Sequence, residues 1–120
     1  MSSIKRCAVI GAGVIGAGWA ARFLLNGIDV TVHDPHPEAE RRARATLANA
    51  LRARERLTLA PIGKLGELSF VGTLAEAVRG ADFIQENAPE REELKRDLLR
   101  EIDAHAPPAA LVQRQPAAGG

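Results

Sequence analysis

A short apolar segment that runs into three spaced glycines constrains the fold of this chain more than any other feature. Residues 7–10 read Cys-Ala-Val-Ile, the uninterrupted apolar run expected of a strand that is buried on both faces. The sequence Gly11-Ala-Gly-Val-Ile-Gly follows at once and opens a largely apolar, helix-like stretch over residues 14–26. The pattern G-x-G-x-x-G is weak alone, but in this context it predicts a tight strand–turn–helix unit.

Strand-like and helix-like segments alternate along the rest of the chain. The pattern predicts strands over residues 4–10, 28–33, 68–71, 81–85 and 109–112. It predicts helices over residues 14–26, 37–56, 73–78 and 89–105, with Thr73 as the N-cap of the third. This alternation is typical of an α/β fold, and we expect an incomplete Rossmann-type, doubly wound parallel sheet of about five strands with helices on both faces.

The spacing of the glycines suits a backbone that approaches a dinucleotide closely. Gly11 permits the tight turn, Gly13 leaves room for a pyrophosphate, and Gly16 lets the helix pack closely on the sheet. The N–H groups of residues 13–15 then lie at a helix N-terminus, where the dipole favours an anion. The candidate cofactor-binding residues of this turn are Gly11, Ala12, Gly13, Val14, Ile15 and Gly16.

An acidic residue ends the second predicted strand. Asp34 lies near the spacing of about 20 residues at which an acid binds the adenosine ribose hydroxyls. Its carboxylate would repel a 2′-phosphate, and residues 35–37 hold no Lys or Arg to offset that repulsion, so the sequence favours NAD over NADP. The alternative is structural: the glycines serve only a turn, and Asp34 serves only as a helix cap.

Composition excludes several other classes of function. The net charge is +1, from 16 basic and 15 acidic residues, which gives no electrostatic case for binding nucleic acid or an anionic membrane. The single cysteine, Cys7, rules out an internal disulfide and a cysteine-based metal site, and we expect it to be a buried thiol. No apolar run reaches the roughly 18 residues of a membrane span, so we expect a cytoplasmic location.

The domain organisation is simple. Residues 1–112 form one NAD-binding domain, the N-terminal part of a Rossmann fold. Residues 113–120 read Gln-Arg-Gln-Pro-Ala-Ala-Gly-Gly, which we expect to be a divergent, disordered tail without a core-forming pattern.

Two stretches of the chain resemble the NAD-binding domain of the 3-hydroxyacyl-CoA dehydrogenase family. Residues 11–20 contain G-V-I-G-x-x-W-A, and residues 81–95 read A-D-F-I-Q-E-x-x-P-E-R-x-x-L-K. Both are similar to the branch that holds the L-carnitine and gulonate dehydrogenases. The resemblance implies oxidation of a 3-hydroxy group with NAD, in L-carnitine, a 3-hydroxyacyl-CoA or a sugar acid. It also implies that Glu86 and Arg91 lie near the nicotinamide end of the cofactor. The alternative is that Glu86 is only an acid at the end of a strand and that Arg91 is only a surface charge on a helix.

The resemblance also implies that catalysis needs more than this chain. In the family a His–Glu pair beyond the fifth strand supplies the base, and a Ser-rich segment stands where this chain reads Gln-Arg-Gln-Pro. We therefore assign no catalytic residue or metal ligand and expect the chain, a fragment of a complete enzyme, to be inactive alone. The family's homodimer forms through a later helical domain, so a dimer is not carried over.

The rival interpretation is a non-catalytic or vestigial NAD-binding fragment. The arginine-rich helix invites a coenzyme A hypothesis, but the sequence does not demand it, because a solvated helix face is the default explanation of such charges.

Overall fold

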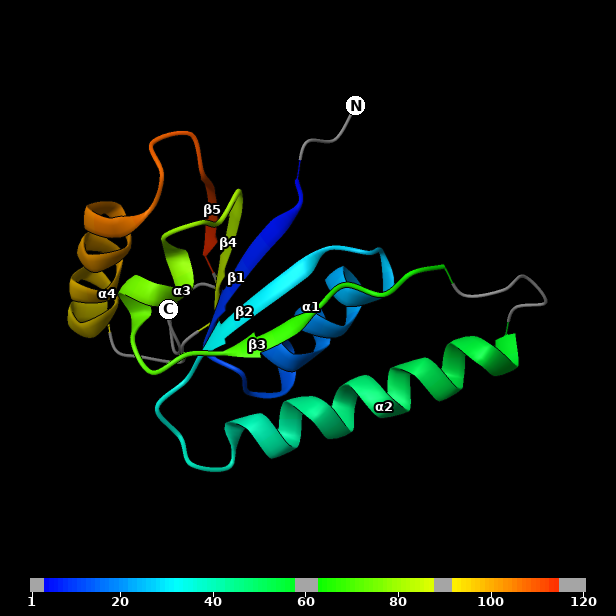
Figure 1. The fold of residues 1–120 in the computed structure, drawn as a ribbon. Coiled ribbons are helices and arrows are strands. Elements are labelled where there is room, and N and C mark those ends of the chain that lie inside the picture. The colour runs from blue at the N-terminus through cyan, green and yellow to red at the C-terminus, as the bar shows by residue number, and fades with distance from the viewer. Residues whose placement is uncertain (1–3, 58–62, 88–91, 115–120) are drawn as a thin grey trace.

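Five parallel strands form one sheet at the centre of the molecule. The computed structural model describes residues 4–57, 63–87 and 92–114. The strands are β1 (Arg6–Ile10), β2 (Asp29–His33), β3 (Leu68–Phe70), β4 (Phe83–Glu86) and β5 (Leu111–Arg114). Their order in the sheet is β3-β2-β1-β4-β5, and all neighbours run parallel (Figure 1). The order reverses between β1 and β4, as in a doubly wound sheet, so the predicted fold class is confirmed.

Four helices cover the two faces of the sheet. Their bounds are α1 (Val14–Leu25), α2 (Ala39–Leu57), α3 (Leu74–Val78) and α4 (Glu92–His105). Helices α1 and α2 lie on one face, and α3 and α4 lie on the other (Figure 1). The three residues at the predicted start of the last helix, 89–91, lie outside the described residues.

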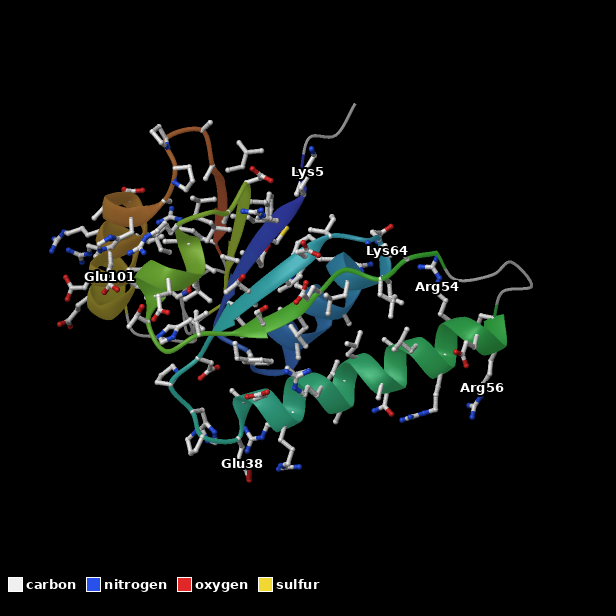
Figure 2. The ribbon with its side chains drawn as sticks, in the orientation of Figure 1. Lys5, Glu38, Arg54, Arg56, Lys64 and Glu101 are labelled. Carbon is white, nitrogen blue, oxygen red and sulfur yellow. The ribbon has the colours of Figure 1, made fainter. Side chains whose placement is uncertain are left out.

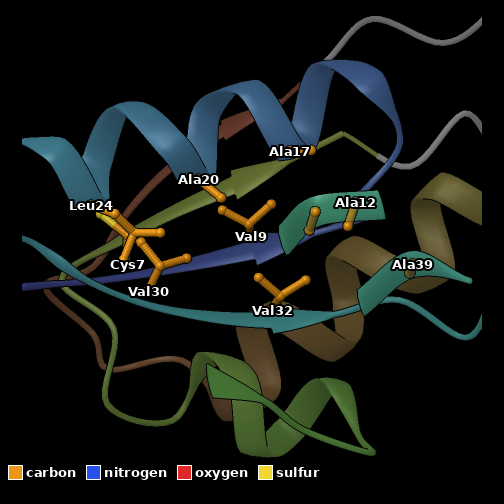
Figure 3. Packing of buried hydrophobic residues seen from close by; sticks show 10 residues of the cluster. Cys7, Val9, Ala12, Ala17, Ala20, Leu24, Val30, Val32 and Ala39 are labelled. Carbon is orange, nitrogen blue, oxygen red and sulfur yellow. The ribbon is translucent and has the colours of Figure 1, made fainter. Parts of the chain in front are cut away.

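Strand β1 is buried on both faces, as its continuous apolar sequence predicts. Because side chains alternate along a strand, Cys7 and Val9 pack into the core beneath α1 and α2, whereas Ala8 and Ile10 pack into the core beneath α3 and α4. Figure 3 shows Val9 of β1 against the small alanines of α1. Each fully buried Val or Ile contributes about 2 kcal/mol from burial alone, so both cores depend on this strand.

Helix α3 begins as the sequence predicts. The Thr73 hydroxyl oxygen accepts a hydrogen bond from the backbone N–H of Glu76 (3.2 Å) and donates to the Glu76 carboxylate (2.8 Å). This reciprocal pair holds the first turn of a helix that is only five residues long.

The arginine-rich helix α2 presents its charges to solvent. Arg41 pairs with Glu38 (3.1 Å) and Arg44 pairs with Glu40 (2.9 Å), with all four side chains exposed. Toward the C-terminal end of α2, Arg54 and Arg56 extend from the helix on different sides (Figure 2). These contacts agree with a solvated helix face. None of the described helices is both long enough and apolar enough to cross a membrane.

Strand β5 lies two residues further along the chain than the sequence predicts. Gln113 pairs with Gln85 and Arg114 pairs with Glu86, so the domain boundary expected at residue 112 falls inside the strand. All four residues of β5 are exposed, since the strand lies at the edge of the sheet and is held by its backbone ladder. Polar side chains are tolerated there, which is why an apolar pattern ends too early. Residues 115–120 of the expected tail lie outside the described residues.

The chemistry of Cys7 yields a first prediction. Burial, with a smaller contribution from the Asp82 carboxylate, raises the pKa of the Cys7 thiol to about 12. At pH 9.5 the thiol of the folded chain therefore stays protonated, whereas in the unfolded chain it ionises. We expect iodoacetamide to label the native chain very slowly at pH 9.5 and to label it rapidly in urea, as measured by mass spectrometry. Equal rates in both conditions would contradict a buried β1.

Candidate cofactor-binding site

The turn after β1 is shaped by two glycines that touch. Gly11 has φ of 90°, a conformation that favours glycine, and its N–H donates to the carbonyl of His33 (3.0 Å). A Cβ at Gly16 would lie 1.9 Å from the carbonyl oxygen of Gly11. Helix α1 can therefore approach the turn only because residue 16 has no side chain, which is the role predicted for it.

The N-terminus of α1 is open. Gly13 is the N-cap, and a Cβ placed there would meet no atom of the described residues within 4 Å. The next two side chains, Val14 and Ile15, are 91% and 52% exposed although both are apolar. The first turn of α1 holds no acidic residue. The positive end of this helix dipole therefore has free space in front of it and no carboxylate from its own first turn, an arrangement that suits an anion.

Asp34 lies beside this open turn. One of its carboxylate oxygens accepts the N–H of Ala12 (2.7 Å), and the other accepts the N–H of His36 (2.8 Å). The carboxylate thus joins the end of β2 to the glycine turn, and each oxygen keeps further acceptor capacity for a ribose hydroxyl. Asp34 does not cap α2, which begins at Ala39, so that part of the structural alternative is wrong.

Glu86 is enclosed at the end of β4. The residue is 0% exposed, and its carboxylate accepts from the Lys95 ammonium group at 3.0 and 3.3 Å. Lys95, on α4, is itself only 6% exposed. The pair ties α4 to the carboxyl end of β4, and the sequence did not reveal it because the partners come from separate elements. Arg91 lies outside the described residues.

A pair of amides on either side of Glu86 was missed by the sequence analysis. Gln85 and Asn87 are 1% and 8% exposed, and the Gln85 side-chain N–H donates to Oδ1 of Asn87 (3.0 Å). Gln85 Oε1 and Asn87 Nδ2 have no hydrogen-bond partner among the described residues. The only signal in the sequence was three polar residues, Gln-Glu-Asn, directly after the apolar part of a strand.

The other polar features of the described residues lie away from the carboxyl ends of the strands or form contacts with the backbone. The ring nitrogen Nδ1 of His33 lies 3.2 Å from the carbonyl of Val71. A pocket of about 380 Å³ is lined by residues at the amino ends of β1 and β2, such as Arg6 and Asp29, whereas ligands of such sheets bind at the carboxyl ends. Within residues 4–57, 63–87 and 92–114, no group of three or more metal-ligating side chains comes together.

These features define the class of the protein as a dinucleotide-binding domain: a doubly wound sheet, an open glycine turn at its switch point and an acid at the end of β2. The sequence model of the 3-hydroxyacyl-CoA dehydrogenase NAD-binding domain matches residues 6–115. The chain belongs to this family of NAD-dependent dehydrogenases. The unsatisfied amide of Asn87 and the open space at Gly13 fit such a cofactor.

Known relatives agree with this membership. An L-carnitine dehydrogenase of Mesorhizobium japonicum is 54% identical over 93% of the chain, which covers 31% of that relative. Among solved structures, an NAD⁺-dependent 5-formyl-3-hydroxy-2-methylpyridine 4-carboxylic acid 5-dehydrogenase has a TM-score of 0.81 at 35% identity, over 94% of this chain and 37% of that one. The 3-hydroxybutyryl-CoA dehydrogenase of Escherichia coli has a TM-score of 0.79 at 29% identity, over 96% and 25%. The chain thus spans 25–37% of the length of these relatives.

The contact between Gly11 and Gly16 yields a stability prediction. Substituting Gly16→Ala forces a methyl group against the Gly11 carbonyl, so we expect the free energy of unfolding to fall by about 1–3 kcal/mol. Urea denaturation followed by circular dichroism measures this change. Gly18→Ala is the matched control in the same helix, because a Cβ there meets nothing within 4 Å and should stabilise α1 by about 0.5–1 kcal/mol. Equal effects of the two substitutions would contradict the close approach.

Proposed function

We propose that this chain is the NAD-holding part of a dehydrogenase that oxidises a 3-hydroxy group, in L-carnitine or a 3-hydroxyacyl-CoA. The observation that carries the proposal is the open N-terminus of α1 beside the Asp34 carboxylate. The names of the relatives support the two substrate classes, and identity to L-carnitine dehydrogenases at 48–54% favours carnitine.

Each residue of the turn has a role in the proposed complex. The backbone N–H groups at residues 13–15 would hold the pyrophosphate, which can approach because Gly13 has no side chain. The Asp34 carboxylate would accept hydrogen bonds from the adenosine ribose while it keeps its bond to the Ala12 N–H. When bound, NAD supplies a nicotinamide ring that accepts a hydride.

Glu86 and Arg91 belong to the nicotinamide side of the proposed site. We propose that Glu86 contributes to the site through its ion pair with Lys95. The Glu86 carboxylate is fully buried, and the pair fixes α4 against the end of β4. The assignment of Arg91 to the cofactor remains a prediction from the sequence.

Catalysis by the chain alone is a separate question. The chain spans 22–35% of the length of the L-carnitine dehydrogenase relatives, and we propose that the base and substrate pocket belong to the remainder. A second candidate is a fragment that binds NAD without turnover. Both candidates predict that the purified chain does not reduce NAD in the presence of L-carnitine. Turnover, followed at 340 nm, would therefore contradict both of them.

Cofactor preference tests the role of Asp34. We expect the chain to bind NAD at least about tenfold more tightly than NADP, because the carboxylate repels a 2′-phosphate. Asp34→Asn keeps the shape of the side chain and removes its charge. The ratio of the affinity for NAD to the affinity for NADP, measured by isothermal titration, should therefore fall toward one. The ratio of the two affinities is informative even if the amide oxygen introduced at residue 34 is a weaker acceptor for the Ala12 N–H and lowers both affinities.

A matched variant tests the glycine turn in the same experiment. In Gly13→Ala the added methyl group meets no atom of the described residues within 4 Å, and stability should fall only by the lower preference for Ala at an N-cap, about 0.5–1 kcal/mol. The methyl group would, however, occupy the space proposed for the pyrophosphate. We expect NAD binding to weaken about tenfold or more. A folded wild-type chain that binds neither NAD nor NADP would overturn the proposed function.

A further inference from the structure

One buried donor next to the glycine turn has no acceptor among the residues that the structure describes. Asn87 is 8% exposed, and its Nδ2 atom has no hydrogen-bond partner among the described residues. A buried amide donor without an acceptor is energetically unfavourable, so the great majority of such groups in folded proteins have a hydrogen-bond partner.

The position of Asn87 indicates what that partner is. Its backbone N–H donates to the carbonyl of Ile10 (2.8 Å), the last residue before the glycine turn. Its Nδ2 lies 3.5 Å from the point where a Cβ at Gly16 would stand, in the first turn of α1. The unpartnered amide therefore lies at the switch point between β1 and β4, against the helix N-terminus that is open to an anion.

The strand order gives the direction of a bound dinucleotide across this site. Asp34, which takes the adenosine ribose, ends β2 on one side of β1, whereas Asn87 follows β4 on the other side. A dinucleotide that runs from Asp34 across the glycine turn brings its diphosphate, and then its nicotinamide half, toward Asn87.

We propose that Asn87 is a cofactor-binding residue whose side-chain N–H donates to the phosphate on the nicotinamide side of the dinucleotide. The inference rests on the proposed function. Gln85 positions the group, because its N–H holds Oδ1 of Asn87 and leaves the NH2 group for the ligand. Turning both amides would keep their mutual bond but set an oxygen against the phosphate, so an anionic ligand selects the orientation observed. Because the amide is covered before binding, its engagement requires a small local shift.

A series of ligands tests the contact independently of activity. Isothermal titration with AMP, ADP and NAD separates the phosphates, because AMP lacks the second one. We expect Asn87→Ala to weaken binding of ADP and NAD about tenfold and that of AMP less than twofold. Asn49→Ala, on the exposed face of α2, is the matched control and should change none of the three.

A second variant and a spectroscopic readout guard against a purely structural effect. Asn87→Asp keeps the shape and can still accept from Gln85, yet it sets a carboxylate against the phosphate, so its loss for ADP should exceed that of Asn87→Ala. In nuclear magnetic resonance spectra, the Asn87 side-chain amide signal, identified by its absence in Asn87→Ala, should shift with ADP and not with adenosine. An unchanged AMP:ADP affinity ratio in both variants would overturn the role of Asn87 alone. Failure of the wild-type chain to bind NAD would overturn the proposed function and this inference with it.

Discussion

The carbonyl oxygen of Gly11 lies where a side chain at residue 16 would begin, with 1.9 Å between that oxygen and the site of a Cβ. The positions of the glycine turn and of α1 depend on this close approach. It lets α1 pack closely on the sheet. There the small side chains of Ala17 and Ala20 pack against β1 and β2, so the helix and the sheet can approach each other. It also fixes the first turn of α1 at the switch point of the sheet, so that its free N–H groups face outward and not into the core.

Much of this arrangement could be predicted from the sequence because it depends on local patterns. The continuous apolar run of β1 and the alternation of elements determine a parallel sheet, and the glycine spacing locates the turn. Polar contacts between distant elements could not be predicted. Nothing in the local pattern says that Glu86 is buried with Lys95, or that Gln85 and Asn87 bond to each other at the end of β4. Strand β5 was ended too early for a related reason, since its last two residues are held by the backbone ladder and not by burial.

Ion pairs contribute very differently according to their burial. The ion pairs of α2, between Arg41 and Glu38 and between Arg44 and Glu40, are exposed, and such pairs contribute little to stability. The pair of Glu86 and Lys95 is buried, so its attraction is set against a large cost of desolvation, and removing either partner would leave a charge stranded in the core. Such a pair fixes the geometry of α4 relative to β4 more than it adds to the free energy of unfolding. It does so at the carboxyl end of β4, where the nicotinamide half of a cofactor is proposed to lie.

The bond between Asp34 and the N–H of Ala12 has a consequence for coenzyme engineering. A usual route to NADP-dependent variants replaces the acid after the second strand with a small or basic residue. Here the same carboxylate also satisfies a backbone donor of Ala12, a residue that is only 2% exposed. A replacement that admits a 2′-phosphate would therefore loosen the turn that must hold the diphosphate. In this scaffold a change of coenzyme therefore has to keep an acceptor for the Ala12 N–H, which an amide side chain at residue 34 still offers through its oxygen.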